Sequence, residues 1–448
     1  MRNEIFEIYD LSVDQQQEFD VLAEQYLGLI NTNPLQHYPA FWQHIVEKLL
    51  HRNLGYDEIE RIYDIYLDQY QDNIQIFEDF ETLILGLKDT VIKKGIIANG
   101  NAKRIYRFLT KYALLDDFDT VVASGATAFK KPDTSIFRLA LLNLGSSPIN
   151  SVFVGDRLDT DVLGANASGL WSVLIRRNNK RENSSSSAPS VIPDFCVTSL
   201  EEIPKLSIFQ MQADIDSVVI PCGGRGSRMN ELTESNQKCL LEVNGKPLLM
   251  RIVEKFKNCG VKNFYFITKY LTEQVEACFQ DGSELDINVT YLGNDRHSTA
   301  YGIYSNLDKL PDKFLYSHGN ILVDNALISK LLKRAYLNPN IPSFVLTRNE
   351  IAKTHPVFEF HNEELVGIFR HKGAESNNEF LYSVGLSYIN KNCIQKLPDN
   401  SFDIDFTAEQ LFHNQGVDSF EYNDNWLHLE SKADLDLFRT QIDNEQFR

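Results

Sequence analysis

Short apolar segments alternating with amphipathic stretches are the feature of this sequence that most limits its fold. Three such segments, Gly95–Ala98, Thr120–Ala123 and Ser151–Gly155, are separated by stretches whose apolar residues lie three and four positions apart. Apolar segments this short are typical of parallel strands buried on both faces, and the stretches between them are typical of covering helices. The sequence therefore predicts an α/β fold for this region.

The pattern indicates two such regions in tandem. Residues 14–85 carry only helix-period spacing, and a further apolar segment begins at residue 217. A chain of 448 residues is long enough for two or three domains. We expect two tandem Rossmann-like three-layer α/β domains. They would comprise residues 1–206 with a helical cap at about 14–85, a linker at 207–215, and residues 216–448.

Charge and cysteine content exclude several classes of function. The formal net charge is −18, from 44 Lys and Arg against 62 Asp and Glu. Such a surface repels nucleic-acid phosphates and anionic lipids, so we expect binding to neither nucleic acid nor membrane. The six cysteines form no Cys-x-x-Cys pair, and the first residues show no apolar leader. We therefore expect reduced thiols and a cytoplasmic protein.

An acidic motif follows the third apolar segment. Asp156 and Asp161 come after Ser151–Gly155, and Lys131 precedes a proline earlier in the chain. Carboxylates at the carboxyl end of a strand are well placed to bind Mg²⁺, and a lysine there can neutralise a phosphate. In this order the residues resemble the haloacid dehalogenase superfamily, in its phosphatase-like branch with a helical cap. The resemblance implies a metal-acid motif from Asp156 to Asp161 and a phosphate-binding Lys131.

The chain departs from this family at its catalytic positions. The resemblance implies an Asp nucleophile at a strand end near the N-terminus and a second Asp two residues later, but the best match places Glu7 and Tyr9 there. Glu is one methylene too long, Tyr has no carboxylate, and the family's Ser or Thr falls on Ala98. We predict a non-catalytic domain, with an active phosphatase using Glu7 as the alternative. The vestigial metal or anion site would comprise Glu7, Lys131, Asp156 and Asp161.

A glycine-rich turn follows the apolar segment that begins at Ser217. Glycines let the backbone approach a ligand and point successive N–H groups at one anion, and arginine adds a bidentate phosphate donor. The turn is neither a Walker loop nor a dinucleotide-binding Gly-x-Gly-x-x-Gly motif. Its candidate phosphate ligands are Gly223, Gly224, Arg225, Gly226, Ser227 and Arg228.

The residues beyond the turn extend the pattern. Lys238 lies ten residues after Arg228, and the segment Asn244–Leu249 follows it. Together with Ser298-Thr299-Ala300 they resemble nucleotidyltransferases that join an NTP to a sugar phosphate or related phosphate ester. The resemblance is to the short guanylyl- and cytidylyltransferases of bacterial surface-polysaccharide pathways. It implies catalytic roles for Lys238 and Arg228, nucleotide contacts for Thr299 and Ala300, and acceptor contacts for Lys246 and Gly385.

The metal positions implied by this second resemblance are altered. A Gly-Asp pair in the relatives corresponds to Gly319-Asn320, and the second acid falls on His428 or Glu430. Because Mg²⁺ prefers hard oxygen ligands, loss of a carboxylate weakens its binding. We predict a Mg²⁺ site at Asn320 and Glu430, with Asp324 as a further candidate ligand.

The predicted function is transfer of a nucleotide from an NTP, with CTP or GTP favoured, to a phosphorylated sugar, polyol or choline-like acceptor. Pyrophosphate would be released, and no protein nucleophile is needed because the acceptor phosphate is already an anion. The resemblance places this reaction in surface-polysaccharide (capsule) precursor synthesis in a bacterium. The competing interpretation is a non-catalytic nucleotide- or sugar-phosphate-binding, regulatory protein. The aromatic-rich helical region would allow a homodimer.

Overall fold

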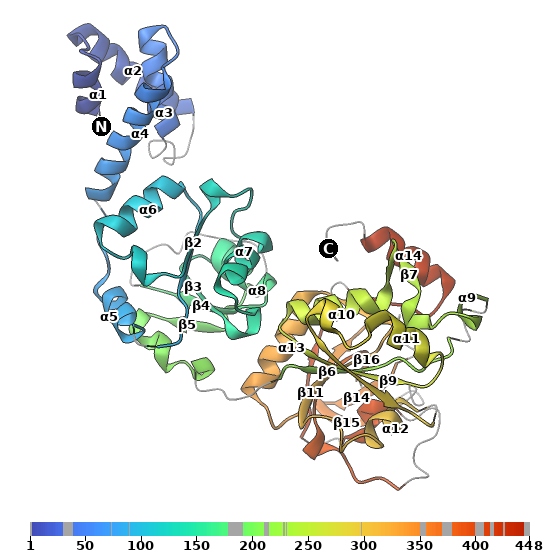
Figure 1. Ribbon diagram of the computed structural model, residues 1–448. Helices are drawn as coiled ribbons and strands as arrows, with labels where there is room; N and C mark the ends of the chain where they lie inside the picture. The colour runs from blue at the N-terminus through green and yellow to red at the C-terminus, as the bar shows by residue number, and fades with distance from the viewer. Residues whose placement is uncertain are drawn as a thin grey trace. The chain divides into compact units, whose positions relative to one another are not determined.

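A computed structural model describes most of the chain (Figure 1). The described residues are 2–29, 39–72, 74–88, 90–177, 191–209, 215–226, 229, 231–296, 298–349, 355–369, 379–398, 407–412, 416–423 and 426–442. The chain forms two compact units. The first comprises Met1–Lys94, Asn99–Asp119 and Ala123–Ala126, and the second comprises Gly95–Ala98, Thr120–Val122 and Thr127–Arg448. Within the described part, no helix is both long and apolar enough to cross a membrane.

The first unit is helical. Its helices are α1 (Arg2–Ile8), α2 (Val13–Leu29), α3 (Pro39–Leu50), α4 (Tyr56–Asp72), α5 (Glu78–Gly86) and α6 (Ala102–Lys111). Ile5, Phe6 and Phe19 are buried in one cluster with Ile45 and Ile62. The rings of Phe6 and Phe19 meet edge to face, with their centres 5.1 Å apart. Side chains from α1 to α4 therefore share a small core of their own.

The prediction that Glu7 stands at the end of a strand is wrong. Glu7 lies in α1, where Ile5 and Phe6 are buried and Glu7 itself is exposed. Consecutive residues of a strand point to opposite faces, so Ile5 and Phe6 could not both face one core from a strand. Burial of both side chains in one cluster therefore favours the helix. The helical region also begins well before residue 14, where the cap was expected to start.

The second unit begins with a small α/β part that we call the N-terminal core. It comprises β1 (Gly95–Ala98), β2 (Thr120–Ala123), β3 (Val152–Gly155), β4 (Trp171–Ile175), β5 (Phe195–Val197), α7 (Thr134–Leu144) and α8 (Leu163–Ala167). Strands β3, β4 and β5 pair in parallel, whereas β1 pairs with β2 in a separate sheet. Ile97 of β1 and Phe153 of β3 nevertheless pack against the same buried cluster.

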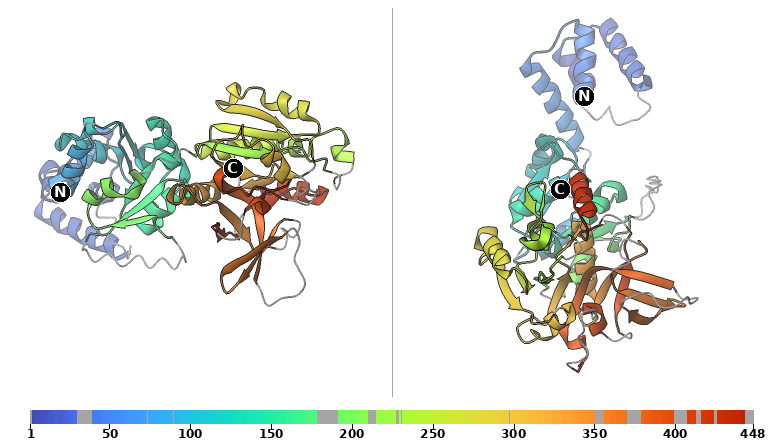
Figure 2. Two further views of the ribbon diagram at one scale, coloured as in Figure 1. Left: turned by 90° about the horizontal axis from the view of Figure 1, so that it is seen from below. Right: turned by 90° about the vertical axis from the view of Figure 1, so that its right-hand side faces the viewer.

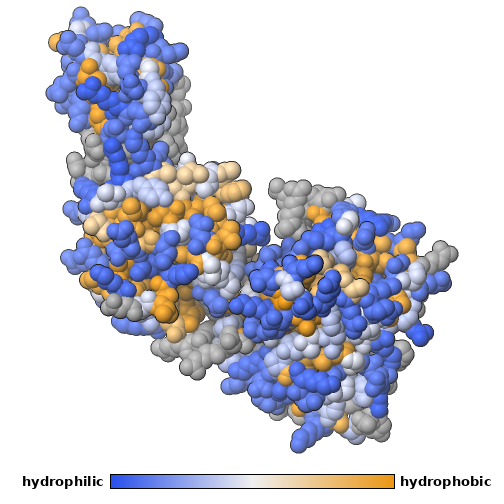
Figure 3. Space-filling view, in the orientation of Figure 1, coloured by the Kyte–Doolittle hydropathy of each residue, from blue (hydrophilic) through white to orange (hydrophobic). Residues whose placement is uncertain are grey.

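Strands β1 and β3 of the N-terminal core, and two apolar residues outside its strands, are less buried than the sequence predicts. All four residues of β3 are only half-buried, and Gly95 at the start of β1 is exposed. Leu142 and Ile192 are 78% and 73% exposed. Figure 3 shows apolar side chains gathered on the visible face of this part of the chain. Among the described residues, β1 and β3 each pair on one edge only, so each has an edge that no neighbouring strand covers.

The rest of the second unit is a larger α/β part, the C-terminal core. Its main strands are β6 (Ser217–Pro221), β9 (Asn263–Thr268), β10 (Asn288–Gly293), β11 (Lys313–Ser317), β13 (Ser343–Thr347), β14 (Val357–His361), β15 (Glu364–Phe369), β16 (Glu379–Asn390) and β17 (Asp418–Glu421). Two short pairs are β7 (Glu242–Val243) with β8 (Lys246–Pro247), and β12 (Ile321–Val323) with β18 (Trp426–His428). Its helices are α9 (Glu231–Glu234), α10 (Leu248–Asn258), α11 (Thr272–Phe279), α12 (Thr299–Tyr304), α13 (Asn325–Leu337) and α14 (Lys432–Ile442).

The large sheet separates two buried layers. Its strand order in the described part is β10-β9-β6-β11-β16-β13-β17, with β14 and β15 joined at β16. Val218 and Ile220 of β6 face a cluster that includes α10, α11, α13 and α14, while Val219 faces a second cluster with α12. Figure 2 shows the β14–β15 ribbon projecting from the remaining strands. Helices thus cover both faces of a mixed sheet, in which β10, β9, β6 and β11 are parallel and β16 pairs antiparallel with β11 and β13. The predicted α/β class is confirmed.

Candidate functional site

The glycine-rich turn lies where the strand order of the large sheet reverses. Strand β6 has β9 on one side and β11 on the other, and ligands of open α/β sheets usually bind at the carboxyl end of such a strand. A Cβ on Gly223 would lie 2.9 Å from Cβ of Lys269, which follows β9. A Cβ on Gly319, which follows β11, would lie 2.8 Å from the carbonyl oxygen of Pro221. Segments that follow three strands therefore meet at this turn.

Gly226 brings the turn against the predicted catalytic lysine. It has a φ of +62°, and a Cβ there would lie 3.2 Å from Cβ of Lys238. Lys238 is half-buried, whereas Gly224 and Arg225 are exposed. The Arg225 guanidinium lies 5.5 Å from the ring centre of Tyr270. The structure thus brings the predicted phosphate-binding backbone and Lys238 together. Two further predicted ligands of this turn, Ser227 and Arg228, lie outside the described residues.

Gln237 holds this arrangement together, although sequence reasoning did not identify it as a functional residue. Its side chain is 1% exposed and donates to the carbonyl oxygens of Cys222 and of Tyr270, the latter at 2.9 Å. Its backbone N–H donates to the side-chain oxygen of Gln274 at 2.8 Å. One amide therefore ties the turn after β6 to the segment after β9, directly before Lys238. Its sequence signal was its place directly before that lysine.

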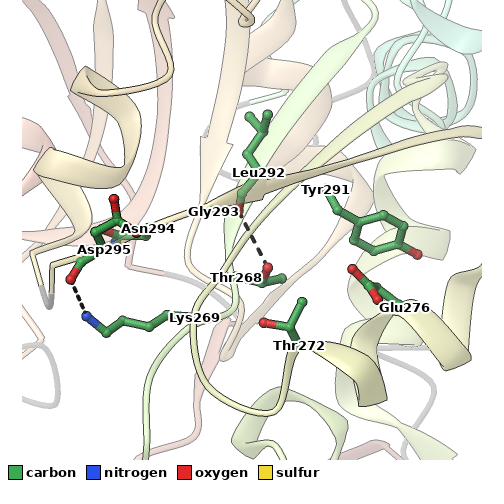
Figure 4. A pocket seen from close by; sticks show the side chains of 9 residues that line it. All are labelled: Thr268, Lys269, Thr272, Glu276, Tyr291, Leu292, Gly293, Asn294 and Asp295. Carbon is green, nitrogen blue, oxygen red and sulfur yellow. Dashed lines mark hydrogen bonds between the residues drawn. The ribbon is translucent and has the colours of Figure 1, made fainter.

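A cavity of about 520 Å³ opens at the carboxyl ends of β9 and β10 (Figure 4). Lys269 forms part of its wall, and its ammonium donates to the carbonyl oxygen of Asp295 at 2.6 Å. Burial, together with the charge of Glu276, raises the pKa of Tyr291 to about 12. Sequence reasoning did not predict this cavity, since the loops that line it are brought together by the pairing of β9 with β10. Lys269 joins it to the glycine-rich turn through Gly223.

The residues predicted to contact the nucleotide or the acceptor also make contacts within the protein. Thr299 and Ala300 begin α12, where Ala300 is fully buried, so that the predicted nucleotide contact of Ala300 has no accessible surface in this structure. Lys246 forms an ion pair with Glu254. Gly385 accepts a hydrogen bond from the backbone N–H of His318 at 2.9 Å. Gly385 therefore lies next to the turn that carries Gly319 and Asn320.

The two predicted metal ligands contact the same histidine. Nδ2 of Asn320 lies 2.9 Å from Nε2 of His428 and donates to the carbonyl oxygen of Leu429, also at 2.9 Å. Oε1 of Glu430 lies 3.5 Å from Nε2 of His428, whose side chain is 2% exposed. Behind it, Nε2 of His355 lies 3.2 Å from the same nitrogen. Asn320 and Glu430 are brought together, but an imidazole contacts both.

These residues do not fit a Mg²⁺ ion held by the protein. Mg²⁺ requires oxygen ligands in near-octahedral geometry, whereas His428 supplies nitrogen. Among the described residues, no group of three His, Cys, Asp or Glu side chains could hold a metal ion. The further candidate Asp324 is not available, because its oxygens accept from the backbone N–H of Leu327 at 2.7 Å and from the hydroxyl of Tyr422 at 2.8 Å. Asp324 caps α13 instead.

The histidine next to His428 is uncharged. Nδ1 of His355 lies 2.7 Å from the carbonyl oxygen of Ser383, which can only accept, so the proton is on Nδ1. Burial, with a smaller contribution from the neighbouring His318, lowers the pKa of His355 to about 4. The place where the resemblance implies metal-binding acids therefore holds largely uncharged groups.

The N-terminal core brings three of the four predicted vestigial residues together. The ammonium of Lys131 lies 2.7 Å from Oδ1 of Asp161, and their side chains are 12% and 5% exposed. Oδ2 of Asp161 accepts from the backbone N–H groups of Asp156 and Arg157, at 3.1 and 3.2 Å. The Asp156 side chain follows β3 at an exposed position. Glu7, on helix α1 of the first unit, is not at a strand end.

Comparison with known proteins agrees with both resemblances. Residues 12–175 match the haloacid dehalogenase-like hydrolase family, and residues 218–383 match the MobA-like NTP transferase domain family. A glyceraldehyde 3-phosphate phosphatase from Methanopyrus kandleri is 30% identical over 151 residues, which cover 33% of this chain and 64% of that protein.

Two further relatives each match about a quarter to a third of the chain. The bifunctional protein GlmU of Methanocaldococcus jannaschii is 29% identical over 122 residues, covering 27% of this chain and 28% of that protein. The bifunctional IPC transferase and DIPP synthase of Aquifex aeolicus is 24% identical over 139 residues, covering 31% and 32%. The chain thus spans less than two thirds of each of these three relatives. With both matches in one polypeptide, the chain joins a haloacid dehalogenase-like domain to an NTP transferase domain.

Proposed function

We propose that the C-terminal core transfers a nucleotidyl group from an NTP to a phosphorylated sugar, polyol or choline-like acceptor and releases pyrophosphate. The observation that carries this proposal is the close approach of Gly226 to Lys238 at the switch point of the sheet. Backbone N–H groups of such a turn bind phosphate oxygens. An ammonium beside them neutralises charge on the α-phosphate as the acceptor oxygen attacks and pyrophosphate leaves.

We assign the nucleoside to the cavity at β9 and β10. The cavity volume of about 520 Å³ is in the range of small-molecule sites, and Lys269 joins the cavity to the glycine-rich turn. A preference for CTP or GTP is the expectation that follows from the resemblance. A role in surface-polysaccharide precursor synthesis, a cytoplasmic location and a homodimer also remain predictions.

The test is a screen of each NTP against sugar 1-phosphates, polyol phosphates and phosphocholine with Mg²⁺, measuring pyrophosphate. We expect release with at least one pair. Absence of release with every pair, while an NTP binds in calorimetry, would favour the second candidate, a non-catalytic nucleotide-binding protein. That candidate is supported by the Asn320–His428 contact, which stands where the resemblance implies acids.

For the N-terminal core we propose a non-catalytic role. Lys131 and Asp161 neutralise each other within a mostly buried ion pair, and the exposed Glu7 lies on a helix. Incubation with p-nitrophenyl phosphate or glyceraldehyde 3-phosphate should release no more phosphate than the Asp161→Asn variant does. Release that depends on Asp161 would refute this part of the proposal.

A further inference from the structure

Helix α13 is buried on two neighbouring faces. On one face Ile328 and Leu332 belong to the core beneath the large sheet. On the second, about 100° further around the helix, Ser329 and Lys333 are four positions apart and therefore lie together, yet they are only 3% and 8% exposed. A helix that covers a sheet ordinarily keeps its polar face in water. Burial of this polar face means that α13 has a second packing partner.

That partner is the N-terminal core, which lies in the same compact unit. The Lys333 ammonium lies 2.6 Å from Oδ2 of Asp194, which directly precedes β5, and 5.5 Å from the ring centre of Trp171. The same Asp194 oxygen accepts from the backbone N–H of Ser172 at 2.8 Å, which holds the carboxylate in place. Burial lowers the pKa of Lys333, while Asp194 acts in the opposite direction. The ion pair is therefore largely removed from solvent.

Close packing surrounds the ion pair. Gly169 has a φ of +81°, and a Cβ there would lie 2.2 Å from Oγ of Ser329, so the chain approaches α13 where only glycine fits. Ile149 and Trp171 of the N-terminal core belong to the same buried cluster as Ile328 beneath the large sheet. The two cores thus share one apolar interior in addition to the ion pair.

Helix α13 also begins at the candidate transferase site. Asn320 directly precedes β12, whose pairing partner among the described residues is β18, and Asp324 then caps α13. Strand β12 is only three residues long, so the place of Asn320 depends on where α13 begins. Lys333 lies nine residues beyond Asp324, about 14 Å along the helix.

We propose that the N-terminal core is a positioning module for the transferase site. It fixes α13 through the Lys333–Asp194 ion pair, and α13 fixes the turn that carries Asn320. Lys333 is then a positioning residue, and the N-terminal core has a role that needs no hydrolysis. The proposal rests on the proposed transferase function only where turnover is measured.

Substituting Asp194 should destabilise the protein more than substituting Lys333. Asp194→Asn leaves the Lys333 ammonium buried without a charged partner, whereas Lys333→Met leaves a carboxylate that is 23% exposed and hydrogen-bonded to Ser172. Breaking one side of a buried ion pair is costly, while replacing both sides is often close to neutral. The double variant should therefore be more stable than the sum of the two single changes implies.

The first experiment compares these three full-length variants with two matched controls. Lys330→Met removes an exposed lysine from the same helix, and Asp312→Asn breaks an ion pair whose aspartate is 71% exposed. We expect Asp194→Asn to lower the midpoint of thermal unfolding by about 5 °C or more. Hydrogen exchange at the amides of residues 320–330 should become about tenfold faster or more. Neither control should change these values, and neither readout needs a substrate.

The second experiment measures turnover. Lys333→Met should lower kcat by about tenfold or more with an unchanged KM for the NTP, because the glycine-rich turn is not carried by α13. Lys333→Arg, which keeps the cation, should retain most of the kcat. Additive effects of the two single changes, or unchanged exchange at residues 320–330 when the ion pair is broken, would overturn the proposal. If the unmodified protein shows no turnover, the exchange measurement still decides it.

Discussion

The side-chain nitrogen of Asn320 lies 2.9 Å from Nε2 of His428, which is 108 positions away in the chain. In the family that this domain resembles, acids are implied near both positions. Here an amide contacts a buried imidazole, and a second imidazole, that of His355, lies behind it. Of the two predicted metal ligands, Asn320 and Glu430, only Glu430 has a carboxylate that could attract a free metal ion.

Mg²⁺ should therefore bind only weakly in the absence of a nucleotide. Calorimetric titration of the full-length protein with MgCl₂ should detect no site with a Kd below about 1 mM, because one carboxylate supplies too few oxygen ligands to hold this ion. Asn320→Asp, which adds a carboxylate beside Glu430, should tighten binding. A submillimolar site in the unmodified protein that Glu430→Gln abolishes would contradict this prediction.

Lys238→Ala should remove most of the proposed transferase activity without affecting folding. Loss of a charge that stabilises the α-phosphate typically lowers kcat by about 100-fold or more. Thermal unfolding should be unchanged, since Lys238 is only half-buried. Lys262→Ala, at an exposed lysine of the same core, is the control and should leave pyrophosphate release intact. Activity close to that of the unmodified protein would remove the assigned role from Lys238.

Stability should fall between pH 6.5 and pH 4 because of His355. The pKa of this side chain is lowered to about 4 in the folded protein, mainly by burial, from an ordinary value of 6.5. As the pH falls through this window, His355 becomes protonated in the unfolded chain but stays uncharged in the folded protein. Protonation therefore stabilises the unfolded chain, and the free energy of unfolding decreases. The loss in free energy of unfolding that His355 causes approaches about 3 kcal/mol near pH 4.

His355→Gln should flatten this part of the stability curve, measured by urea unfolding at several pH values. Besides burial, His318 lowers the pKa of His355, whereas the Ser383 carbonyl, Glu409 and Glu430 raise it. His51→Asn, at an exposed histidine, should leave the slope unchanged. An identical pH slope in the His355 variant would show that its burial is not the cause.

Asp161→Ala should destabilise the protein far more than Asp159→Ala. Asp161 is 5% exposed and is the partner of the nearly buried Lys131, so its removal should cost about 3–5 kcal/mol. Asp159 pairs with Arg157 at the surface, where both side chains are at least 39% exposed, and its loss should cost less than about 1 kcal/mol. Chemical unfolding measures both. Equal effects would mean that the Lys131–Asp161 pair adds no stability.

The two halves of the chain differ in how well sequence patterns predicted them. In the C-terminal core the apolar strand, the glycine-rich turn and Lys238 lie within about twenty residues, and short-range patterns describe such segments well. Near the N-terminus the same reasoning placed Glu7 at a strand end. There Ile5 and Phe6 are buried together with Phe19 and Ile45 in a helical cluster, and residues distant in the chain decided the conformation.

The sequence by itself determined the α/β class, the glycine-rich turn after β6 and the pairing of two domain types, because each depends on residues close together in the chain. Tertiary structure alone decided which polar groups meet. Gln237 reaches the carbonyl oxygen of Tyr270 across 33 positions, and Lys333 reaches Asp194 across 139. Such contacts form because buried polar groups must find partners once the apolar layers have packed. Where those partners lie is settled by the packing of whole helices and strands.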